Sequence, residues 1–107
     1  MDNKDNITEV DANEVYNMHL SNHIKVIDIR EPYEHRDITM NGTLNIPMNQ
    51  LISNVDMYMK KDEIYYLLCN SGSRSYHLTK ILVDNGFNVI NAKGGIISIK
   101  ELKRFKS

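Results

Sequence analysis

The chain is 107 residues long, with 41% hydrophobic and 25% charged side chains, which is the size and composition of one globular domain. Its 13 basic and 14 acidic residues leave a formal net charge of -1, too little to attract nucleic acid or an anionic membrane through the field of the whole molecule. No apolar run is long enough for a signal peptide or a membrane span. We therefore expect a single cytoplasmic domain over residues 1–107, with a flexible end at residues 1–6.

The first part of the chain alternates short apolar runs with a helical pattern. Residues 7–10 are predicted to form an edge strand. Asp11 and Glu14 have the spacing of a capping box for a helix over residues 12–20. Residues 25–30 contain Val26, Ile27 and Ile29 and predict a buried strand.

The second part of the chain continues this alternation. The predicted elements are a helix over residues 49–59, a strand over 63–68, a helix over 75–85, a strand over 88–91 and a helix over 96–105. Gly86 suits the left-handed cap at the end of the helix before it. Alternating strands and helices predict an α/β fold with a parallel sheet that is covered on both faces.

The single cysteine, Cys69, directly follows a predicted strand. Loops at the carboxyl ends of parallel strands form the ligand crevice of such a sheet, so we expect the thiol to be reactive. The small and polar residues after it can curl so that backbone N–H groups and the positive end of the next helix favour a thiolate. This active-site loop comprises Cys69, Asn70, Ser71, Gly72, Ser73, Arg74 and Ser75.

Two residues of this loop have specific expected roles, and the cysteine has an alternative one. Gly72 permits the positive φ that a tight loop requires. Arg74 either binds an oxyanion by a two-pronged contact or braces the loop. Cys69 could instead be a small buried hydrophobic residue, which is a common fate of a free cysteine.

Several segments, in this order, resemble the rhodanese family. The loop matches the family pattern C-x-x-G-x-R-S at Cys69, Gly72, Arg74 and Ser75. Each piece is weak evidence alone, and their order and spacing make the resemblance specific. The other similar segments are residues 26–34 (D-V-R-E-x-x-E-Y in the family), 42–47 (G-A-x-N-I-P), 85–87 (a G-F turn) and 94–95 (the double glycine of L-x-G-G).

The resemblance implies a rhodanese-like fold, with a central, mostly parallel sheet of about five strands and helices on both faces. It also implies a sulfurtransferase in which Cys69 accepts sulfane sulfur from a small donor such as thiosulfate. The resulting persulfide would pass its sulfur to a thiol or to cyanide. Asp28, Arg30 and Glu34 would support the fold and the loop, and neither a cofactor nor a metal is expected.

Two other functions fit parts of the pattern. Cysteine phosphatases and arsenate reductases of related fold place five residues between cysteine and arginine, whereas four separate Cys69 from Arg74, a tighter cradle that favours a sulfur atom. A rhodanese-like module could also be a non-catalytic binding domain or a sulfur relay that works only with a partner protein. No second cysteine is present to resolve a persulfide within the chain, so an outside thiol must do so.

The histidines are expected to have no catalytic or metal-binding role. His19 and His23 are four residues apart and could supply half of a metal site, but no further ligands accompany them. His35 and His77 are predicted to be ordinary polar side chains rather than general bases.

Overall fold

The computed structural model describes residues 7–21 and 23–103, and the strands in these residues form one sheet. Neighbouring strands are parallel throughout, in the order β1-β5-β4-β2-β3. The predicted α/β class is therefore confirmed, and the sheet is entirely parallel rather than mostly so. The five strands are β1 (Thr8–Asp11), β2 (Lys25–Asp28), β3 (Leu44–Asn45), β4 (Ile64–Leu68) and β5 (Asn88–Lys93).

The central strand, β4, is buried on both faces of the sheet. Successive side chains of a strand point to opposite faces, and Leu67 and Leu68 are both fully buried. Leu67 is in register with Ile27 of β2 and with Asn91 of β5. Since these strands are parallel, the loops that follow them meet at one edge of the sheet, where a ligand crevice is expected.

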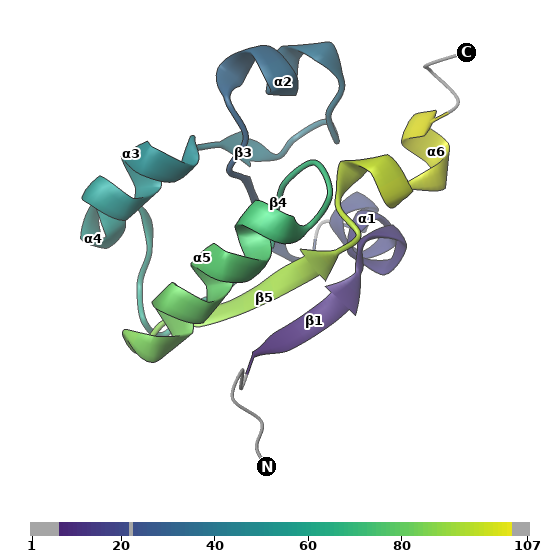
Figure 1. Cartoon of the computed structure of the whole chain (residues 1–107). Helices are drawn as coiled ribbons and strands as arrows, with labels where there is room; N and C mark the ends of the chain where they lie inside the picture. Colours follow the sequence, from purple (N-terminus) through teal and green to yellow (C-terminus); the bar gives the residue numbers. More distant parts are fainter. Residues whose placement is uncertain (1–6, 22, 104–107) are drawn as a thin grey trace.

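One face of the sheet is covered by α3 (Met48–Ser53), α4 (Val55–Tyr58) and α5 (Ser73–Asp84), and α5 lies in front of β5 in Figure 1. Leu51 of α3 and Leu78 of α5 are fully buried in this part of the core. The long helix α5 runs back along β5 after leaving the loop at the end of β4. Its first turn therefore lies at the crevice edge of the sheet.

The other face is covered by α1 (Ala12–Leu20), the short 3-10 helix η1 (Ile96–Ser98) and α6 (Lys100–Lys103). Val15 of α1 and Ile99 between the last two helices are fully buried there, in a second apolar cluster. Helices thus cover both faces, as predicted. Within the described residues, none of the helices combines the length and the apolar character needed to cross a bilayer.

Two predicted helices are interrupted. The helix predicted over residues 49–59 is divided into α3 and α4 at Asn54, whose backbone has φ -141° and ψ 43°. The side-chain amide of Asn54 donates to the carbonyl of Gln50 over 3.2 Å, a local bond that competes with helical pairing. The helix predicted over residues 96–105 begins as η1 and turns at Ile99, and its residues 104–105 lie outside the described residues.

Capping also differs from the prediction. Asp11 caps α1 by accepting the N–H of Asn13 over 2.8 Å, rather than the N–H of Glu14. A capping box is instead present in α2 (Pro32–Asp37), which had not been predicted, where the N–H of Glu31 donates to Glu34 over 2.9 Å. This box holds Glu34 at the crevice edge of the sheet.

Candidate active site

The sulfur of Cys69 lies in a cradle of hydrogen-bond donors. Cys69 follows the last residue of β4, and Sγ accepts the backbone N–H of Gly72 over 3.1 Å and that of Ser75 over 3.4 Å. The Ser75 hydroxyl donates to the same sulfur over 3.3 Å. Donors that converge at the start of a long helix stabilise negative charge, so this arrangement can hold a thiolate or a persulfide anion.

Gly72 makes the tight curl of the loop possible. Its φ is +92°, a left-handed conformation that residues with a side chain rarely adopt, and it caps the N-terminus of α5. A Cβ at this position would lie 2.9 Å from the backbone nitrogen of Gly94. The predicted requirement for glycine thus has two causes, the backbone conformation and the close approach of the chain after β5.

The turn after β5 holds the loop through backbone hydrogen bonds. The N–H of Ile96 donates to the carbonyl of Cys69 over 2.9 Å, and that of Ile97 donates to Asn70 over 3.0 Å. Gly95 allows this approach, because a Cβ there would lie only 2.4 Å from the carbonyl oxygen of Asn70. Cys69 and Asn70 are therefore held by residues 27 positions further along the chain.

The remaining residues of the predicted loop have different environments. Ser75 is fully buried beneath the sulfur, whereas the side chains of Ser71 and Ser73 are exposed and Asn70 is partly buried. Cys69 itself is only 1% exposed. Access to its thiol therefore depends on small movements of the loop or of the groups around it.

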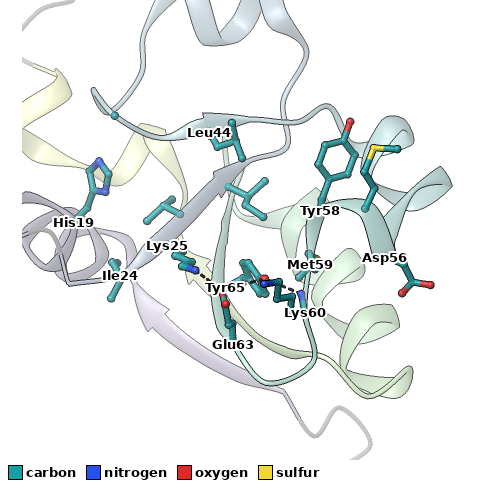
Figure 2. A pocket seen from close by; sticks show the side chains of 14 residues that line it. His19, Ile24, Lys25, Leu44, Asp56, Tyr58, Met59, Lys60, Glu63 and Tyr65 are labelled. Atoms are coloured by element: carbon teal, nitrogen blue, oxygen red, sulfur yellow. Dashed lines mark hydrogen bonds and ion pairs between the residues drawn. The ribbon is translucent and has the colours of Figure 1, made fainter.

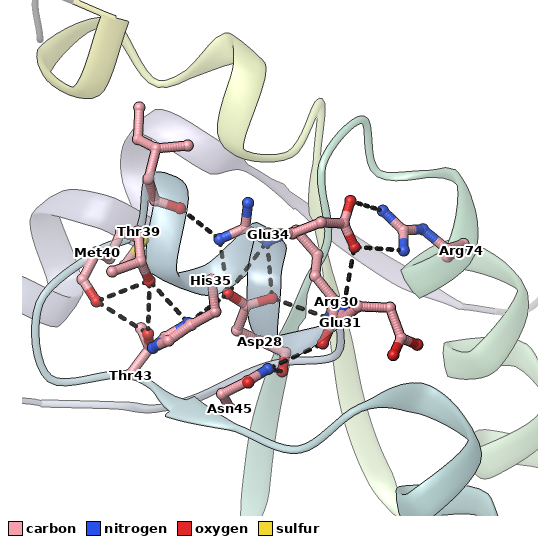
Figure 3. A network of polar contacts seen from close by, with 11 residues as sticks. Asp28, Arg30, Glu31, Glu34, His35, Thr39, Met40, Thr43, Asn45 and Arg74 are labelled. Atoms are coloured by element: carbon pink, nitrogen blue, oxygen red, sulfur yellow. Dashed lines mark hydrogen bonds and ion pairs between the residues drawn. The ribbon is translucent and has the colours of Figure 1, made fainter. Parts of the chain in front are cut away.

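The guanidinium of Arg74 is bound by the carboxylate of Glu34 (Figure 3). Its guanidinium donates to both carboxylate oxygens of Glu34, each over 3.0 Å, so α5 is joined to α2. The hydrogen bonds of this pair lower the pKa of Glu34 and raise that of Arg74. Of the two roles predicted for Arg74, this geometry corresponds to bracing the loop.

A buried polar network lies beside this pair (Figure 3). Arg30 donates to both carboxylate oxygens of Asp28, over 2.8 to 3.1 Å, and its Nη2 also donates to the carbonyl of Ile38 over 2.6 Å. His35 Nδ1 donates to Asp28 over 2.8 Å. Burial acts to raise the pKa of Asp28, but the hydrogen bonds from Arg30 and His35 outweigh it and leave the pKa lowered. The predicted supporting residues thus fasten α2 to the end of β2.

Two amide side chains bind backbone carbonyls in and beside the site, and neither was singled out from the sequence. Asn45 donates to the carbonyls of both Asp28 and Arg30 over 2.9 Å. Asn91 of β5 donates to the carbonyl of Gly72 over 3.4 Å and so contacts the loop. The sequence around a single asparagine in a strand does not predict such a contact, because the partner of the asparagine is distant in the sequence.

A cavity of about 390 Å³ adjoins the loop. Its walls come from α2, from Asn70 and from η1, and they include Tyr33, Ile38 and Ile97. Asn70 is the residue after the cysteine, so a molecule in this cavity would lie against the loop that holds the sulfur.

The cavity of about 500 Å³ shown in Figure 2 is remote from the loop. It is lined by His19, Lys25 and Glu63, and the last two mark the amino ends of β2 and β4, opposite the crevice edge. Nε2 of His19 is hydrogen-bonded to the carbonyl of Asn41 over 2.7 Å. Within residues 7–21 and 23–103, no group of three or more histidine, cysteine, aspartate or glutamate residues could hold a metal ion.

Two known proteins of similar sequence carry sulfurtransferase names. The chain is 34% identical over 76 residues to a protein of Allochromatium vinosum named sulfurtransferase, covering 70% of each chain. It is 30% identical over 73 residues to YtwF of Bacillus subtilis, which also has a sulfurtransferase name, covering 68% of this chain and 70% of that one.

The fold has close counterparts among solved structures. A crystal structure of a protein from Staphylococcus saprophyticus superposes with a TM-score of 0.80 at 28% identity, covering 89% of this chain and 95% of the other. The sequence profile of the rhodanese-like domain matches residues 11–102. That match extends from the start of α1 to α6 and includes the whole sulfur loop, so this chain belongs to the rhodanese-like domain family.

Proposed function

We propose that this protein is a sulfurtransferase that carries sulfane sulfur as a persulfide on Cys69. The observation that supports this most directly is the convergence of the Gly72 and Ser75 N–H groups and the Ser75 hydroxyl on one sulfur atom. Such a cradle stabilises an anion on sulfur both before and after transfer. The sulfurtransferase names of its relatives agree with this chemistry.

The loading step takes sulfur from a donor such as thiosulfate. The Cys69 thiolate attacks the outer sulfur of thiosulfate, a new S–S bond forms, and the bond from that sulfur to the sulfonate breaks. Sulfite leaves with the electron pair, and the enzyme retains a persulfide anion. The number of electrons is conserved, so no cofactor is needed.

The discharge step returns the enzyme to its starting state. A nucleophilic acceptor attacks the outer persulfide sulfur, the S–S bond breaks, and the Cys69 thiolate leaves. Cyanide would give thiocyanate, and a thiol would give a new persulfide. The donors of the loop hold the leaving thiolate, which lowers the barrier to its departure.

A second candidate function is a partner-dependent sulfur relay. It is favoured by the burial of Cys69, which is 1% exposed, and by the absence of a second cysteine from the sequence. A partner that displaced the loop could receive the sulfur on its own thiol. Both functions use the same persulfide, and we place this chemistry in the cytoplasm, where a free thiol stays reduced.

The test compares the reduced protein with Cys69→Ser. Each is incubated with thiosulfate, its intact mass is recorded, and thiocyanate is assayed after cyanide is added. We expect one added sulfur atom and thiocyanate production only when Cys69 is present. Persulfide without thiocyanate would favour the relay.

A phosphatase assay tests the alternative activity. Hydrolysis of an aryl phosphate that depends on Cys69, with no sulfur taken up from thiosulfate, would contradict the proposed function. We expect no such hydrolysis, because four residues between Cys69 and Arg74 make a small loop and Glu34 already occupies the guanidinium that would bind a phosphoryl group.

A further inference from the structure

The sequence contains two Asn-Gly pairs, Asn41-Gly42 and Asn85-Gly86. In such a pair the backbone nitrogen of the glycine can attack the side-chain amide carbon of the asparagine and close a five-membered ring, because glycine has no side chain to hinder the approach. All four residues are exposed to solvent. Exposure therefore does not distinguish the two pairs, whereas their hydrogen bonds do.

Hydrogen bonds hold the second pair at both of the groups that would react. The side-chain amide of Asn85 donates to the carbonyl of Ile81 over 2.7 Å. The N–H of Gly86 donates to the carbonyl of Val83 over 3.0 Å at the end of α5. Both bonds must break before the nitrogen can reach the amide carbon, so the fold protects Asn85.

The first pair is held at neither of these groups. Among the residues that the structure describes, the side-chain amide of Asn41 and the N–H of Gly42 have no hydrogen-bond partner. The pair lies in the middle of a turn before β3, which the N–H of Thr43 closes by donating to the carbonyl of Met40 over 3.3 Å. The amide carbon and the nitrogen can therefore meet without the loss of a hydrogen bond at either group.

A histidine from α1 is hydrogen-bonded to the peptide group that contains the nitrogen of Gly42. His19 Nε2 lies 2.7 Å from the carbonyl oxygen of Asn41. A carbonyl can only accept, so Nε2 carries a proton and donates it to this bond. When the nitrogen of the same peptide group loses its proton, negative charge moves onto the carbonyl oxygen. A donor that is already placed on the oxygen stabilises this charge.

We propose that Asn41 is a site of spontaneous deamidation and that His19 promotes the reaction. The nitrogen of Gly42 gives its proton to solvent and bonds to the side-chain carbon of Asn41. The bond from that carbon to the amide nitrogen breaks, and the nitrogen takes up a proton and leaves as ammonia. Water then adds to one carbonyl of the ring and opens it to aspartate or isoaspartate, so water is consumed and no oxidant or reductant is needed. The product carries a carboxylate beside His19.

The experiment follows both asparagines in the same full-length chain. The protein is incubated in mildly alkaline buffer prepared with heavy-oxygen water, because only deamidation during the incubation then introduces the label. Trypsin afterwards releases Asn41 in peptide 37–60 and Asn85 in peptide 81–93, and fragment masses locate the label within each peptide.

The folded protein should acquire the label at Asn41 at least about tenfold faster than at Asn85, because hydrogen bonds protect only the second pair. In guanidinium chloride the two rates should become similar, because both pairs have the sequence Asn-Gly. Equal rates at Asn41 and Asn85 in the folded protein would overturn the assignment of the site.

His19→Phe keeps an aromatic ring and removes the hydrogen-bond donor. We expect this variant to slow labelling of Asn41 about fivefold in the folded protein and to have no effect in guanidinium chloride. His19→Leu should act in the same way, and continued protection of Asn85 reports that each variant is folded. Unchanged or faster labelling of Asn41 in both folded variants would overturn the role of His19.

The reaction at Asn41 does not involve the sulfur atom. Cys69→Ser should therefore be labelled at Asn41 at the rate of the wild-type protein. Failure of the wild type to take up sulfur would overturn the proposed function and leave the deamidation site standing, so the two proposals are tested separately.

Discussion

At the scale of the residue, Cys69 combines two properties that the sequence presented as alternatives. It packs in the apolar core with Leu67 and Leu78, as a small hydrophobic residue would. Its sulfur also accepts the N–H groups of Gly72 and Ser75. Buried donors without an acceptor cost about 1–3 kcal/mol each, so the sulfur stabilises the loop while the loop stabilises negative charge on the sulfur.

Gly95 provides a test of how closely the backbone is packed around the sulfur. In Gly95→Ala the new Cβ would lie 2.4 Å from the carbonyl oxygen of Asn70 and 2.6 Å from that of Cys69. Both oxygens belong to backbone and cannot move alone, so we expect the loop to be displaced. Stability should fall by about 1–3 kcal/mol, and persulfide formation should be lost. Urea unfolding and intact mass after thiosulfate measure the two effects.

Gly86→Ala is the matched control. Gly86 also has a positive φ, +94°, but the nearest atom to its Cβ would be the flexible Lys61 Nζ at 3.5 Å. This substitution should cost about 1–2 kcal/mol from backbone conformation alone and leave sulfur uptake intact. Normal uptake by Gly95→Ala as well would contradict the role given to the glycine turn.

At the scale of the elements, the pair Arg74 and Glu34 couples α5 to α2. Their side chains are 41% and 22% exposed, so the interaction is partly screened by water. We expect a double-mutant cycle with Glu34→Gln and Arg74→Gln to give a coupling energy of about 0.5–1 kcal/mol, because the contact has two parallel hydrogen bonds. Urea unfolding of the four proteins measures it.

The surface pair of Lys25 and Glu63 is the comparison for this cycle. It is a single contact, with side chains 60% and 33% exposed. Its coupling energy should be smaller than that of Arg74 with Glu34, and should decrease further in high salt. If Lys25 and Glu63 gave a coupling energy as large as that of Arg74 and Glu34, the two parallel hydrogen bonds of the second pair would add no coupling energy beyond that of a single contact.

At the scale of the whole molecule, the carboxylates of Asp28 and Glu34 make stability depend on pH. Both have pKa values below their ordinary ones of 3.8 and 4.5. Their contribution is complete above the unfolded values and is lost as the pH falls through the lower folded values. We therefore expect the urea midpoint to begin falling below about pH 4.5 and to keep falling below 3.8.

Asp28→Asn tests the contribution of Asp28 to this dependence. At pH 7 the variant leaves the buried guanidinium of Arg30 without its anion, which we expect to cost roughly 3–5 kcal/mol. Its stability should then change less between pH 5 and pH 3 than that of the wild type. Combining it with Arg30→Met should recover part of the loss, and an unchanged acid profile in Asp28→Asn would contradict this assignment.

Much of the architecture could be predicted from local sequence. Strands β2, β4 and β5 are apolar runs, and the helix starting at Ser73 is marked by its apolar spacing and by Gly86. The two-residue strand β3 and the six-residue helix α2 are too short to show a period, and Asn54 divides a helix that has regular apolar spacing. Such short elements are determined by their neighbours in the fold.

The sequence by itself determined the family, the parallel α/β class and the prediction of Cys69 as the reactive residue, because these depend on short-range patterns of apolar residues and glycines. The tertiary structure alone decided that Arg74 is bound by Glu34, forty residues away, and that Gly95 lies beneath the carbonyl of Asn70. It also decided that a cavity with walls from α2, Asn70 and η1 adjoins the loop. Contacts between distant segments leave no periodic signal in a single chain, since they arise only when parallel strands bring their carboxyl ends together.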